Sequence, residues 1–570
     1  GNTVKLGGRI VSVRDLGKIV FISLRSGGEL AQVCVNVGPN FSRDQLNEVK
    51  TSIKSGDIIG AEGVVGRTKQ GEVTLFASSV KVLAPYVCSD LTVIPDQRTF
   101  EVVRKKASSP QRENGAISDP DLKYRYRFVD LITDPISLNT FRARHKILQS
   151  LRRFLDSRGF VEVETPVFHS VPCGANARPF TTHHNANNAD LFLRVAPELY
   201  LKQCVVGGLD RVYEIGKVFR NEDSDRSHNP EFTSCEFYSA FSSYEDLMPM
   251  TEDILREMAI GVIGEPVIEV ISGGSAVCID LRKPFKRVSV YDAVQEAAGV
   301  SLPPPTELDT PTGMAFMAAI MLQHRIPLPS VKTASKYFDK LIDHFVTDHV
   351  VEPTFVCDHP LFMSPLAKEC SKRPGISERF ELFINGMEIC NSYSELNDPM
   401  EQLRRFEQQM RDKDLGDDEA MSLDETFLKA LQTGLPPTAG WGMGIDRVVM
   451  LLTKSKSIRD VMLFPLLRPD DSHDAKRRRK TASFFGFNQQ MTLFCLSGLE
   501  AELQRRGELG VKVEHLKALR RTVLELSRRR SELEEQLEKC REAAKGDPAA
   551  PTSLWVKLLQ DVLCGRGAQQ

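Results

Sequence analysis

The densest run of chemically capable side chains lies between residues 219 and 238. It contains Phe219-Arg-Asn-Glu222, then His228-Asn-Pro-Glu-Phe232, then Cys235-Glu-Phe-Tyr238. An arginine neutralises a phosphate or a carboxylate through its rigid fork of donors, whereas a buried glutamate is tolerated only opposite a cation. The run therefore predicts a site that holds an anion and a cation together, as ATP and a basic substrate would require.

A β-hairpin would position these side chains. We expect strands at 212–220 and 232–240, joined by a polar loop that carries His228. Because side chains alternate between the two faces of a strand, Glu236 and Tyr238 then share one face. A surface hairpin with a charged loop would explain any one of these residues, but it explains the joint pattern less well.

A second strand with a polar face is expected at Ile389-Cys-Asn-Ser-Tyr-Ser-Glu395. Asn391, Tyr393 and Glu395 alternate onto one face, and the acids Glu381 and Glu388 precede them. A face made only of polar residues needs water or a ligand. In a buried site, an amide, a phenol and a carboxylate together could read an amino acid by hydrogen bonds and charge.

Two helices flank these strands in the expected fold. Apolar residues recur at helical spacing over 138–158, and Gly159 is a fitting C-cap before a strand and Pro166. Pro197 opens a second helix and places Glu198 in its first turn. The helix dipole alone would favour a carboxylate there, so Glu198 carries little information by itself.

The N-terminal residues 4–85 form short β-rich segments broken by glycine, with one polar segment near 42–54. This pattern is typical of a small barrel. Such barrels bind single-stranded nucleic acid with exposed aromatic and basic side chains, which Phe21, Arg14 and Arg25 would supply. A polar stretch that contains proline and serine follows at about 104–122 and favours a linker.

Composition sets only broad bounds. The 570 residues, 41% of them hydrophobic, allow several domains, and a formal net charge of −2 predicts no partner. The 12 cysteines show no C-x-x-C pair or zinc-like spacing, which favours reduced thiols and a reducing compartment. No apolar run is long enough to span a membrane. The chain begins with Gly rather than Met, so its first residues do not decide between the cytoplasm and the mitochondrial matrix as its compartment.

Three stretches resemble the signature motifs of class II aminoacyl-tRNA synthetases of subclass IIb, in the form found in lysyl-tRNA synthetases. The run at 219–238 is similar to motif 2, Gly159-Phe-Val-Glu-Val-Glu-Thr-Pro166 to motif 1, and Gly440-Trp-Gly-Met-Gly-Ile-Asp-Arg447 to motif 3. A single glycine-rich run would be weak evidence, but three motifs in this order are specific.

The resemblance covers residues 1–469 and implies an α+β protein. It predicts an OB-fold barrel at 1–88, a linker at 89–133, and a catalytic domain at 134–469 with an antiparallel sheet flanked by helices. Residues 470–570 fall outside it and are expected to form a basic linker and a helical C-terminal extension.

The resemblance also implies the reaction of a lysine–tRNA ligase. The lysine carboxylate attacks the α-phosphorus of ATP to give lysyl-adenylate and pyrophosphate, and a ribose hydroxyl at the 3′ end of tRNA(Lys) then displaces AMP. Positioning and charge neutralisation by Arg220, Arg447 and Mg²⁺ would supply most of the catalysis. No covalent enzyme intermediate and no general base are expected.

For ATP, the resemblance implies that Arg220 holds the α-phosphate and the substrate carboxylate with help from Asn391, and that adenine stacks between Phe232 and Arg447. The remaining implied ATP contacts are Glu222, His228, Glu381 and Glu388, of which the last two coordinate Mg²⁺.

For lysine, the implied contacts are Gly174 and Glu198 to the α-amino group, Glu236, Tyr238 and Glu395 to the ε-ammonium, and Tyr393 to the aliphatic stem. An ammonium group that leaves water needs charged and neutral acceptors around it, and these residues provide both.

The same resemblance implies partners for two further regions. Phe21, Gln32 and Glu72, near Arg14, fall where the family places a stacking ring and base-edge contacts for the tRNA anticodon. All of them are also ordinary barrel residues. The motif 1 helix and strand, including Pro166, form the homodimer interface in the family, although an ordinary core helix would have the same sequence pattern.

Three alternatives stay open. The motif 2 loop, Asp223-Ser-Asp-Arg-Ser227, is more acidic than usual and partly resembles the aspartyl and asparaginyl relatives. A site for aspartate should offer cations, whereas Glu198, Glu236 and Glu395 offer the reverse. A catalytically idle RNA-binding paralogue is disfavoured by the intact motif residues. A lysyltransferase that acts on a protein is disfavoured by the N-terminal barrel.

The C-terminal residues carry two signals of their own. The run Lys476-Arg-Arg-Arg-Lys480 could bind tRNA phosphates, act as a targeting signal or simply be solvated. Apolar residues in 512–545 follow a heptad spacing interrupted by Arg530. This spacing indicates a coiled-coil partner or a helix packed on the enzyme's own surface.

Overall fold

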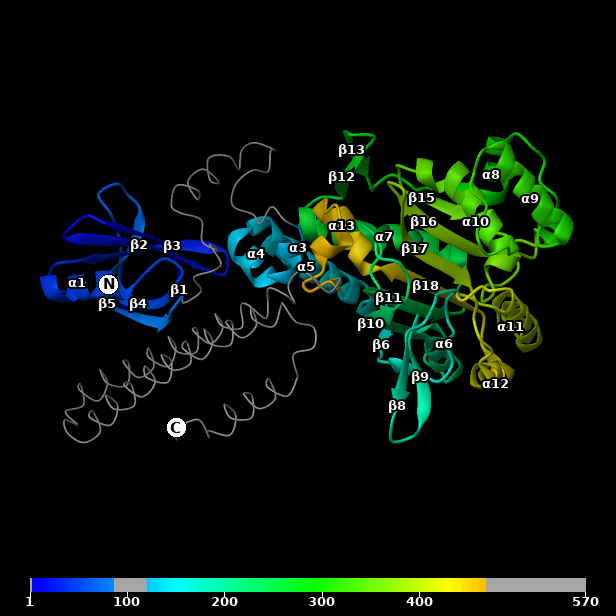
Figure 1. Cartoon of the computed structure of the whole chain (residues 1–570), viewed down its shortest axis with the longest axis horizontal. Helices are drawn as coiled ribbons and strands as arrows, with labels where there is room; N and C mark the ends of the chain where they lie inside the picture. Colours follow the sequence, from blue (N-terminus) through cyan, green and yellow to red (C-terminus); the bar gives the residue numbers. More distant parts are fainter. Residues whose placement is uncertain (1–2, 87–119, 468–570) are drawn as a thin grey trace, which may run out of the picture. The chain divides into compact units, whose positions relative to one another are not determined.

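The computed structural model describes residues 3–86 and 120–467, which form two separate units (Figure 1). One is a closed barrel and the other is a larger unit with a mixed α+β architecture. The expected α+β fold class is therefore confirmed. Residues 89–119 of the linker predicted at 89–133, and the basic run and heptad segment predicted after residue 469, lie outside the described residues.

The N-terminal unit is a five-stranded barrel with the strand order β1-β2-β3-β5-β4. Its strands are β1 (Thr3–Asp15), β2 (Ile19–Ser26), β3 (Glu29–Asn36), β4 (Ile58–Arg67) and β5 (Val73–Ala84). Val20, Ile22 and Leu24 alternate into the barrel core. The polar segment predicted near 42–54 is helix α1 (Arg43–Ser52), which begins with a capping box between Ser42 and Gln45. The barrel prediction is confirmed.

The larger unit is built on an eight-stranded sheet with the order β14-β15-β16-β17-β18-β11-β10-β6. Its strands are β6 (Val161–Glu162), β10 (Arg211–Phe219), β11 (Glu231–Ala240), β14 (Lys286–Ser289), β15 (Thr354–Cys357), β16 (Arg379–Ile384), β17 (Met387–Ser394) and β18 (Thr438–Gly444). The central pairs are antiparallel, and only the two edge pairs are parallel. The predicted hairpin is confirmed as β10 and β11.

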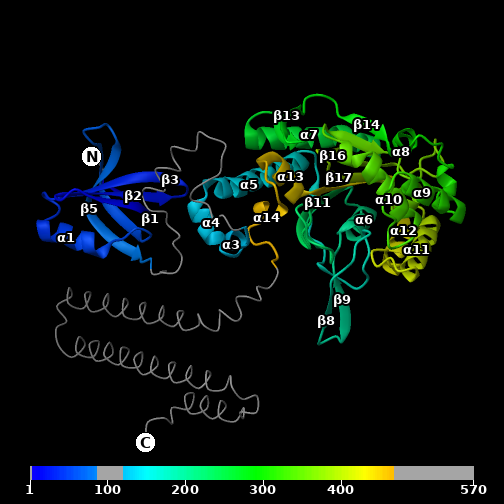
Figure 2. The same ribbon diagram turned by 45° about the horizontal axis from the view of Figure 1, so that its top comes forward.

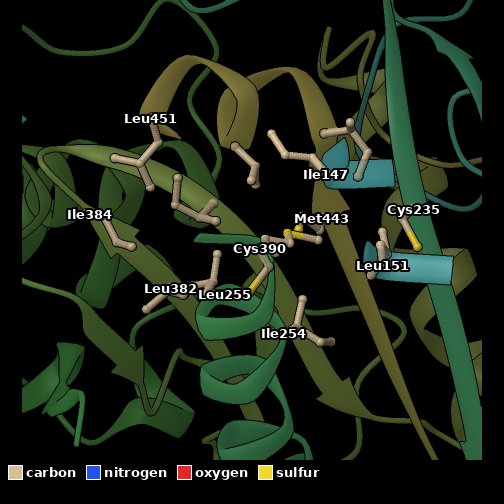
Figure 3. Close-up of a cluster of buried hydrophobic side chains, with 14 of the residues drawn as sticks. Ile147, Leu151, Cys235, Ile254, Leu255, Leu382, Ile384, Cys390, Met443 and Leu451 are labelled. Carbon is tan, nitrogen blue, oxygen red and sulfur yellow. The ribbon is translucent and has the colours of Figure 1, made fainter. Parts of the chain in front are cut away.

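Helices cover one face of this sheet. They are α5 (Pro135–Asp156), α7 (Tyr244–Ile263) and α13 (Ile445–Thr453), and their apolar sides meet the sheet in one continuous core. Figure 3 shows Cys390 and Met443 from the sheet beside Leu255 of α7, and Cys235 beside Leu151 of α5. Because Cys235 and Phe237 point into this core, their neighbours Glu236 and Tyr238 point to the opposite face.

Smaller elements surround that opposite face and the ends of the sheet (Figure 2). Its neighbours are α6 (Glu198–Val206), α11 (Pro399–Asp414), α12 (Glu425–Gly434) and the small sheet of β7 (Phe168–His169), β8 (Thr181–His184) and β9 (Ala189–Leu193). A separate helical core contains α8 (Val290–Ala298), α9 (Pro311–Gln323) and α10 (Ala334–Phe345). The remaining elements are β12 (Val267–Ser272), β13 (Ser275–Asp280), η1 (Pro305–Glu307), η2 (Thr347–His349) and η3 (Leu361–Met363). In the described parts of the chain, no helix has both the length and the apolar composition to cross a membrane.

Part of the predicted linker is structured. Residues 120–133, which the sequence analysis assigned to the linker, form α3 (Pro120–Arg125) and α4 (Arg127–Thr133). Arg127 is fully buried, pairs with Asp130 at 2.7 Å, and donates to the carbonyl oxygens of Arg459, Met462 and Leu463 next to α14 (Ile458–Val461). These long-range hydrogen bonds attach α4 to the catalytic unit.

The buried Arg127–Asp130 pair generates a stability prediction. Arg127→Met leaves Asp130 as an uncompensated buried carboxylate, which should lower the free energy of unfolding by about 3–5 kcal/mol. Arg404→Met is a matched control, because Arg404 and Glu401 have the same sequence spacing but side chains that are 63% and 30% exposed. Urea unfolding followed by circular dichroism measures both. Equal losses in the two variants would contradict the role of burial.

Candidate functional site

A cavity of about 410 Å³ opens on the sheet face opposite the helical core. Its walls come from β11, β17 and β18, from α6, and from the loop between β10 and β11. The predicted site residues that line it are Gly174, Glu198, Arg220, Glu222, His228, Phe232, Glu236, Tyr238, Glu381, Glu388, Asn391, Tyr393 and Arg447. Glu395 does not line the cavity and lies behind its wall.

Arg220 follows directly after β10 and is fixed through its backbone, whose N–H donates to the carbonyl of Pro230 at 2.8 Å. Its guanidinium lies 5.3 Å from the centre of the Phe232 ring. The buried Nε of Arg220 donates to no group in the described residues. A guanidinium with a free donor on a cavity wall is suited to bind a phosphate or a carboxylate.

The loop between β10 and β11 places His228 against Arg447. Arg447 Nη2 lies 2.9 Å from His228 Nε2, and His228 Nδ1 lies 2.8 Å from Asp225 Oδ2. Because a guanidinium can only donate, Nε2 accepts and Nδ1 carries the proton. Although partial burial opposes ionisation, the hydrogen bonds from His228 and Ser227 lower the pKa of Asp225 to about 2. A charged Asp225 therefore sets the tautomer of His228.

A β-bulge brings Glu388 and Asn391 to the same cavity. Residues 388 and 391 would lie on opposite faces of a regular strand. The register of β16 and β17 shifts between Leu382, which pairs with Cys390, and Phe383, which pairs with Glu388. Ile389 is left without a partner, and this extra residue turns Glu388 back toward the cavity.

Arg379 and His359 hold the acid Glu381. Arg379 Nη2 donates to its Oε1 at 2.5 Å, and His359 Nε2 lies 3.2 Å from its Oε2. Burial raises the pKa of Glu381, but Arg379 and His359 outweigh burial and bring it to about 2. Glu388, on the neighbouring strand β17, also lines the cavity, and its Oε2 accepts from Arg447 Nη1 at 3.1 Å. The cationic part of the cavity, lined by Arg220, Arg379 and Arg447, therefore also contains the two carboxylates just described.

The other part of the cavity is acidic. Tyr393 Oη donates toward both oxygens of Glu198 at 2.7 Å, and Tyr238 Oη donates to Glu236 Oε2 at 3.1 Å. Burial and the charge of Glu198 raise the pKa of Glu236 to about 8, although Tyr238 and Arg220 oppose that rise. An arriving cation would be favoured here, because it would offset the cost of ionising Glu236.

Gly440 forms the floor beside Glu395. A Cβ atom at residue 440 would lie 2.1 Å from Glu395 Oε1 and 2.5 Å from Tyr238 Cε1, so only glycine fits. Gly174, on the other wall, has a φ of 102°, which is also a conformation suited to glycine. These two glycines let backbone approach the cavity closely.

Sequence reasoning missed several residues of this site. Lys202, fully buried, pairs with Glu198 at 2.6 Å and with Glu395. The signal that could have found it is its spacing of four residues from Glu198 on one helix. Arg379 and His359 were also missed, and Arg379 lies two residues before Glu381 on the same strand, so alternation places both on one face.

The residues predicted to contact the anticodon lie on the outer surface of the barrel. Arg14 pairs with Phe21 across β1 and β2, and Gln32 lies opposite Ser23 on the neighbouring strand, so alternation places Arg14, Phe21 and Gln32 on one face. Glu72 lies in the turn before β5, which pairs with β3 at Gln32. In the larger unit, Pro166 is exposed between β6 and β7.

Comparison with known proteins identifies the family. A family model described as "tRNA synthetases class II (D, K and N)" matches residues 119–468, and one described as "OB-fold nucleic acid binding domain" matches residues 4–83. A probable cytoplasmic lysine–tRNA ligase of Encephalitozoon cuniculi is 44% identical over 474 residues, covering 82% of this chain and 88% of the relative.

Two further relatives agree. A lysine–tRNA ligase of Cladosporium cladosporioides is 43% identical and covers 83% of this chain and 77% of the relative. A lysine–tRNA ligase of Halalkalibacterium halodurans is 41% identical, with 82% and 87% covered. Together with the barrel, the antiparallel sheet and the cavity, these similarities show that the chain belongs to the class II tRNA synthetases, within the group of the lysine–tRNA ligases.

Proposed function

We propose that this protein activates L-lysine with ATP and transfers it to tRNA(Lys). The observation that carries the proposal is that one cavity contains both Arg220 and two acids, the buried Glu198 and the half-buried Glu236. An amino acid with a second ammonium group fits this arrangement, because its carboxylate meets a cation and its ammonium groups meet carboxylates. Aspartate or asparagine would leave the acids unpaired, which argues against the relatives that use them.

Lysine would lie across the acidic part of the cavity. Glu198 and the backbone at Gly174 are suited to the α-amino group, and Glu236 with the Tyr238 hydroxyl is suited to the ε-ammonium. The Tyr393 ring lies along the same wall and would pack on the aliphatic stem. Glu395 is proposed to act from behind the wall through Oε1, which accepts no hydrogen bond from the described residues.

ATP would occupy the cationic part. Arg220 is positioned to bind the α-phosphate and the substrate carboxylate, and Asn391, whose Oδ1 accepts from Arg379 Nε at 3.0 Å, is oriented to help. Adenine would stack between Phe232 and Arg447, and Glu222 and His228 would also contact ATP. Arg447 would have to leave His228 for this stacking, since the two are hydrogen-bonded to each other.

The carboxylates of Glu381 and Glu388 fit Mg²⁺, because they are hard oxygen donors on one cavity wall and Glu381 stays ionised. Among the described residues, no group of three or more His, Cys, Asp or Glu side chains could hold a metal by itself. The site therefore suits an ion that completes its coordination with substrate phosphates. When bound, Mg²⁺ would neutralise charge on those phosphates.

The residues of the chain would catalyse the first step by positioning. Arg220 would hold the lysine carboxylate in line with the α-phosphorus and neutralise charge that develops on its oxygens. The carboxylate oxygen forms the bond to phosphorus as the bond to pyrophosphate breaks, so no residue needs to accept a proton. In the second step, the 3′ ribose hydroxyl attacks the lysyl carbonyl and AMP leaves.

Three further roles belong to the same proposal. The face with Arg14, Phe21 and Gln32, together with Glu72, would bind the tRNA anticodon by stacking and base-edge contacts. The segment around Pro166 would form a homodimer interface. The protein would work in a reducing compartment, the cytoplasm or the mitochondrial matrix, and the described cysteines are all free thiols.

The experiment that tests the function is amino-acid-dependent ATP–pyrophosphate exchange with Mg²⁺. Lysine should drive exchange, whereas aspartate and asparagine should not. Arg220→Lys should lose most of the activity with the fold intact, because a point charge cannot reproduce bidentate binding. Exchange driven by aspartate or asparagine instead of lysine would falsify the proposal.

The pKa of Glu236 generates a pH prediction. Below about pH 8 this carboxyl carries a proton that must leave before the ε-ammonium can pair with it. The KM for lysine should therefore fall as pH rises from 6 to 8 and level off above. Glu236→Gln should raise this KM by about 10- to 100-fold and remove the pH dependence. A variant with the wild-type pH profile would exclude Glu236 from the lysine site.

Gly440 generates a steric prediction. Gly440→Ala pushes a methyl group against Glu395 and Tyr238, which are both buried and cannot retreat. The KM for lysine should rise by at least about tenfold. Gly442→Ala is the control, because its Cβ would meet Glu236 Cγ at an ordinary 3.5 Å. Similar kinetics for the two variants would show that the floor tolerates a side chain.

A further inference from the structure

Lys202 is a charged group that the proposed reaction leaves unused. Its side chain is fully buried on α6, one turn after Glu198. The ammonium group contacts Glu198 Oε1 at 2.6 Å and Glu395 Oε2, and it lies 5.8 Å from the Tyr393 ring and 5.6 Å from the Phe427 ring. A lysine without access to water needs such acceptors, because burial of an ammonium group is costly.

Lys202 lies on the far side of the acids from the substrate. Glu198 lines the cavity, whereas Lys202 and Glu395 do not. Each acid therefore has one side toward Lys202 and another toward the cavity or its floor. Glu395 uses Oε2 for Lys202, and its Oε1, beside Gly440, has no hydrogen-bond partner in the described chain.

The charges of this group match one class of substrate. When ionised, Glu198, Glu236 and Glu395 carry three negative charges, and Lys202 neutralises one of them. Two negative charges remain for the cavity. L-Lysine has two ammonium groups, and its carboxylate has a separate partner in Arg220, so a diammonium substrate would leave no charge unpaired.

The surrounding groups support this count. Burial opposes the charge of Lys202, but Glu198 and Glu395 raise its pKa above the usual value, so it stays protonated. Burial raises the pKa of Glu395, and the Lys202 ammonium counteracts that rise. The other titratable groups near the pair are Glu198, Glu236, Tyr238, Tyr393 and Cys173, and Arg220 acts on Glu236. Burial raises the pKa of Tyr238, Tyr393 and Cys173, so none of them ionises near neutral pH.

We propose that Lys202 is a positioning residue that fixes Glu198 and Glu395 as acceptors and sets the charge of the cavity for a diammonium amino acid. This inference rests on the proposed lysine activation. Without Lys202, three carboxylates would share one buried site, and a second carboxyl besides Glu236 would hold a proton until the substrate displaced it. Lys202 removes that cost before lysine arrives.

The test compares Lys202→Met with wild type in ATP–pyrophosphate exchange between pH 6.5 and 8.5. The variant should raise the KM for lysine by about 10- to 100-fold at pH 7 while the KM for ATP stays near wild type. Its lysine KM should also fall more steeply with pH, by one additional proton, since a second carboxyl must now ionise. Lys336→Met is the matched control, because the Lys336–Glu419 pair lies outside the cavity.

A second variant distinguishes the effect of the Lys202 charge from a general disruption of the site. Lys202→Met with Glu395→Gln again leaves two negative charges, so the pH dependence of the lysine KM should return to the wild-type slope even if affinity stays reduced. This double variant should lose less stability than the single one, because it removes one buried charge of each sign and Glu198 keeps the Tyr393 hydroxyl as a donor.

The outcomes are distinct. A wild-type enzyme that fails to activate lysine refutes the proposed function. A wild type that activates lysine, with a Lys202→Met variant of unchanged lysine KM and slope, refutes the role of Lys202. A double variant that keeps the steeper slope also refutes it, and if the single variant is unfolded, the slope of the double variant alone decides.

Discussion

A buried carboxylate must face a cation, and this constraint governs the whole catalytic unit. Glu381 is held by Arg379 and His359, and Glu395 is held by Lys202, so each acid is compensated from a different element of the fold. Among the acids that line the cavity, Glu198, Glu381 and Glu388 each pair with a cation of the fold, whereas Glu236 accepts only from the Tyr238 hydroxyl. The pattern of compensated and uncompensated charge, rather than the shape of the cavity alone, separates a nucleotide region from an amino-acid region.

The sheet fixes the distance between these two regions. Arg220 follows the end of β10, and Glu236 lies in the middle of β11, which pairs with β10 over residues 231–239 and with β18 over residues 234–240. The helical core behind the sheet prevents either strand from shifting. The distance between the group that would bind a carboxylate and the group that would bind an ammonium is therefore set by backbone hydrogen bonds and not by flexible loops.

Much of this arrangement could be predicted from the sequence, because strand alternation and motif spacing are local signals. The hairpin, the shared face of Glu236 and Tyr238, and the barrel were predicted correctly. The bulge at Ile389 could not be predicted, because it depends on the register of β16 and β17. Lys202 was missed because a buried lysine looks like a surface residue until its partners are known. Arg127, in a segment predicted to be linker, shows the same difficulty.

Gly440 has a consequence for how this cavity could change during evolution. The space that a side chain at 440 would need is already filled by Glu395 and the Tyr238 ring. A larger residue at 440 is therefore compatible only with smaller residues at 395 and 238, and shortening Glu395 first takes one of its two carboxylate partners from Lys202. A mutational path that introduces a side chain at 440 has to alter three positions that are not adjacent in sequence, and each single change disturbs the proposed lysine site. The close packing at one glycine thus makes the choice of substrate difficult to reverse.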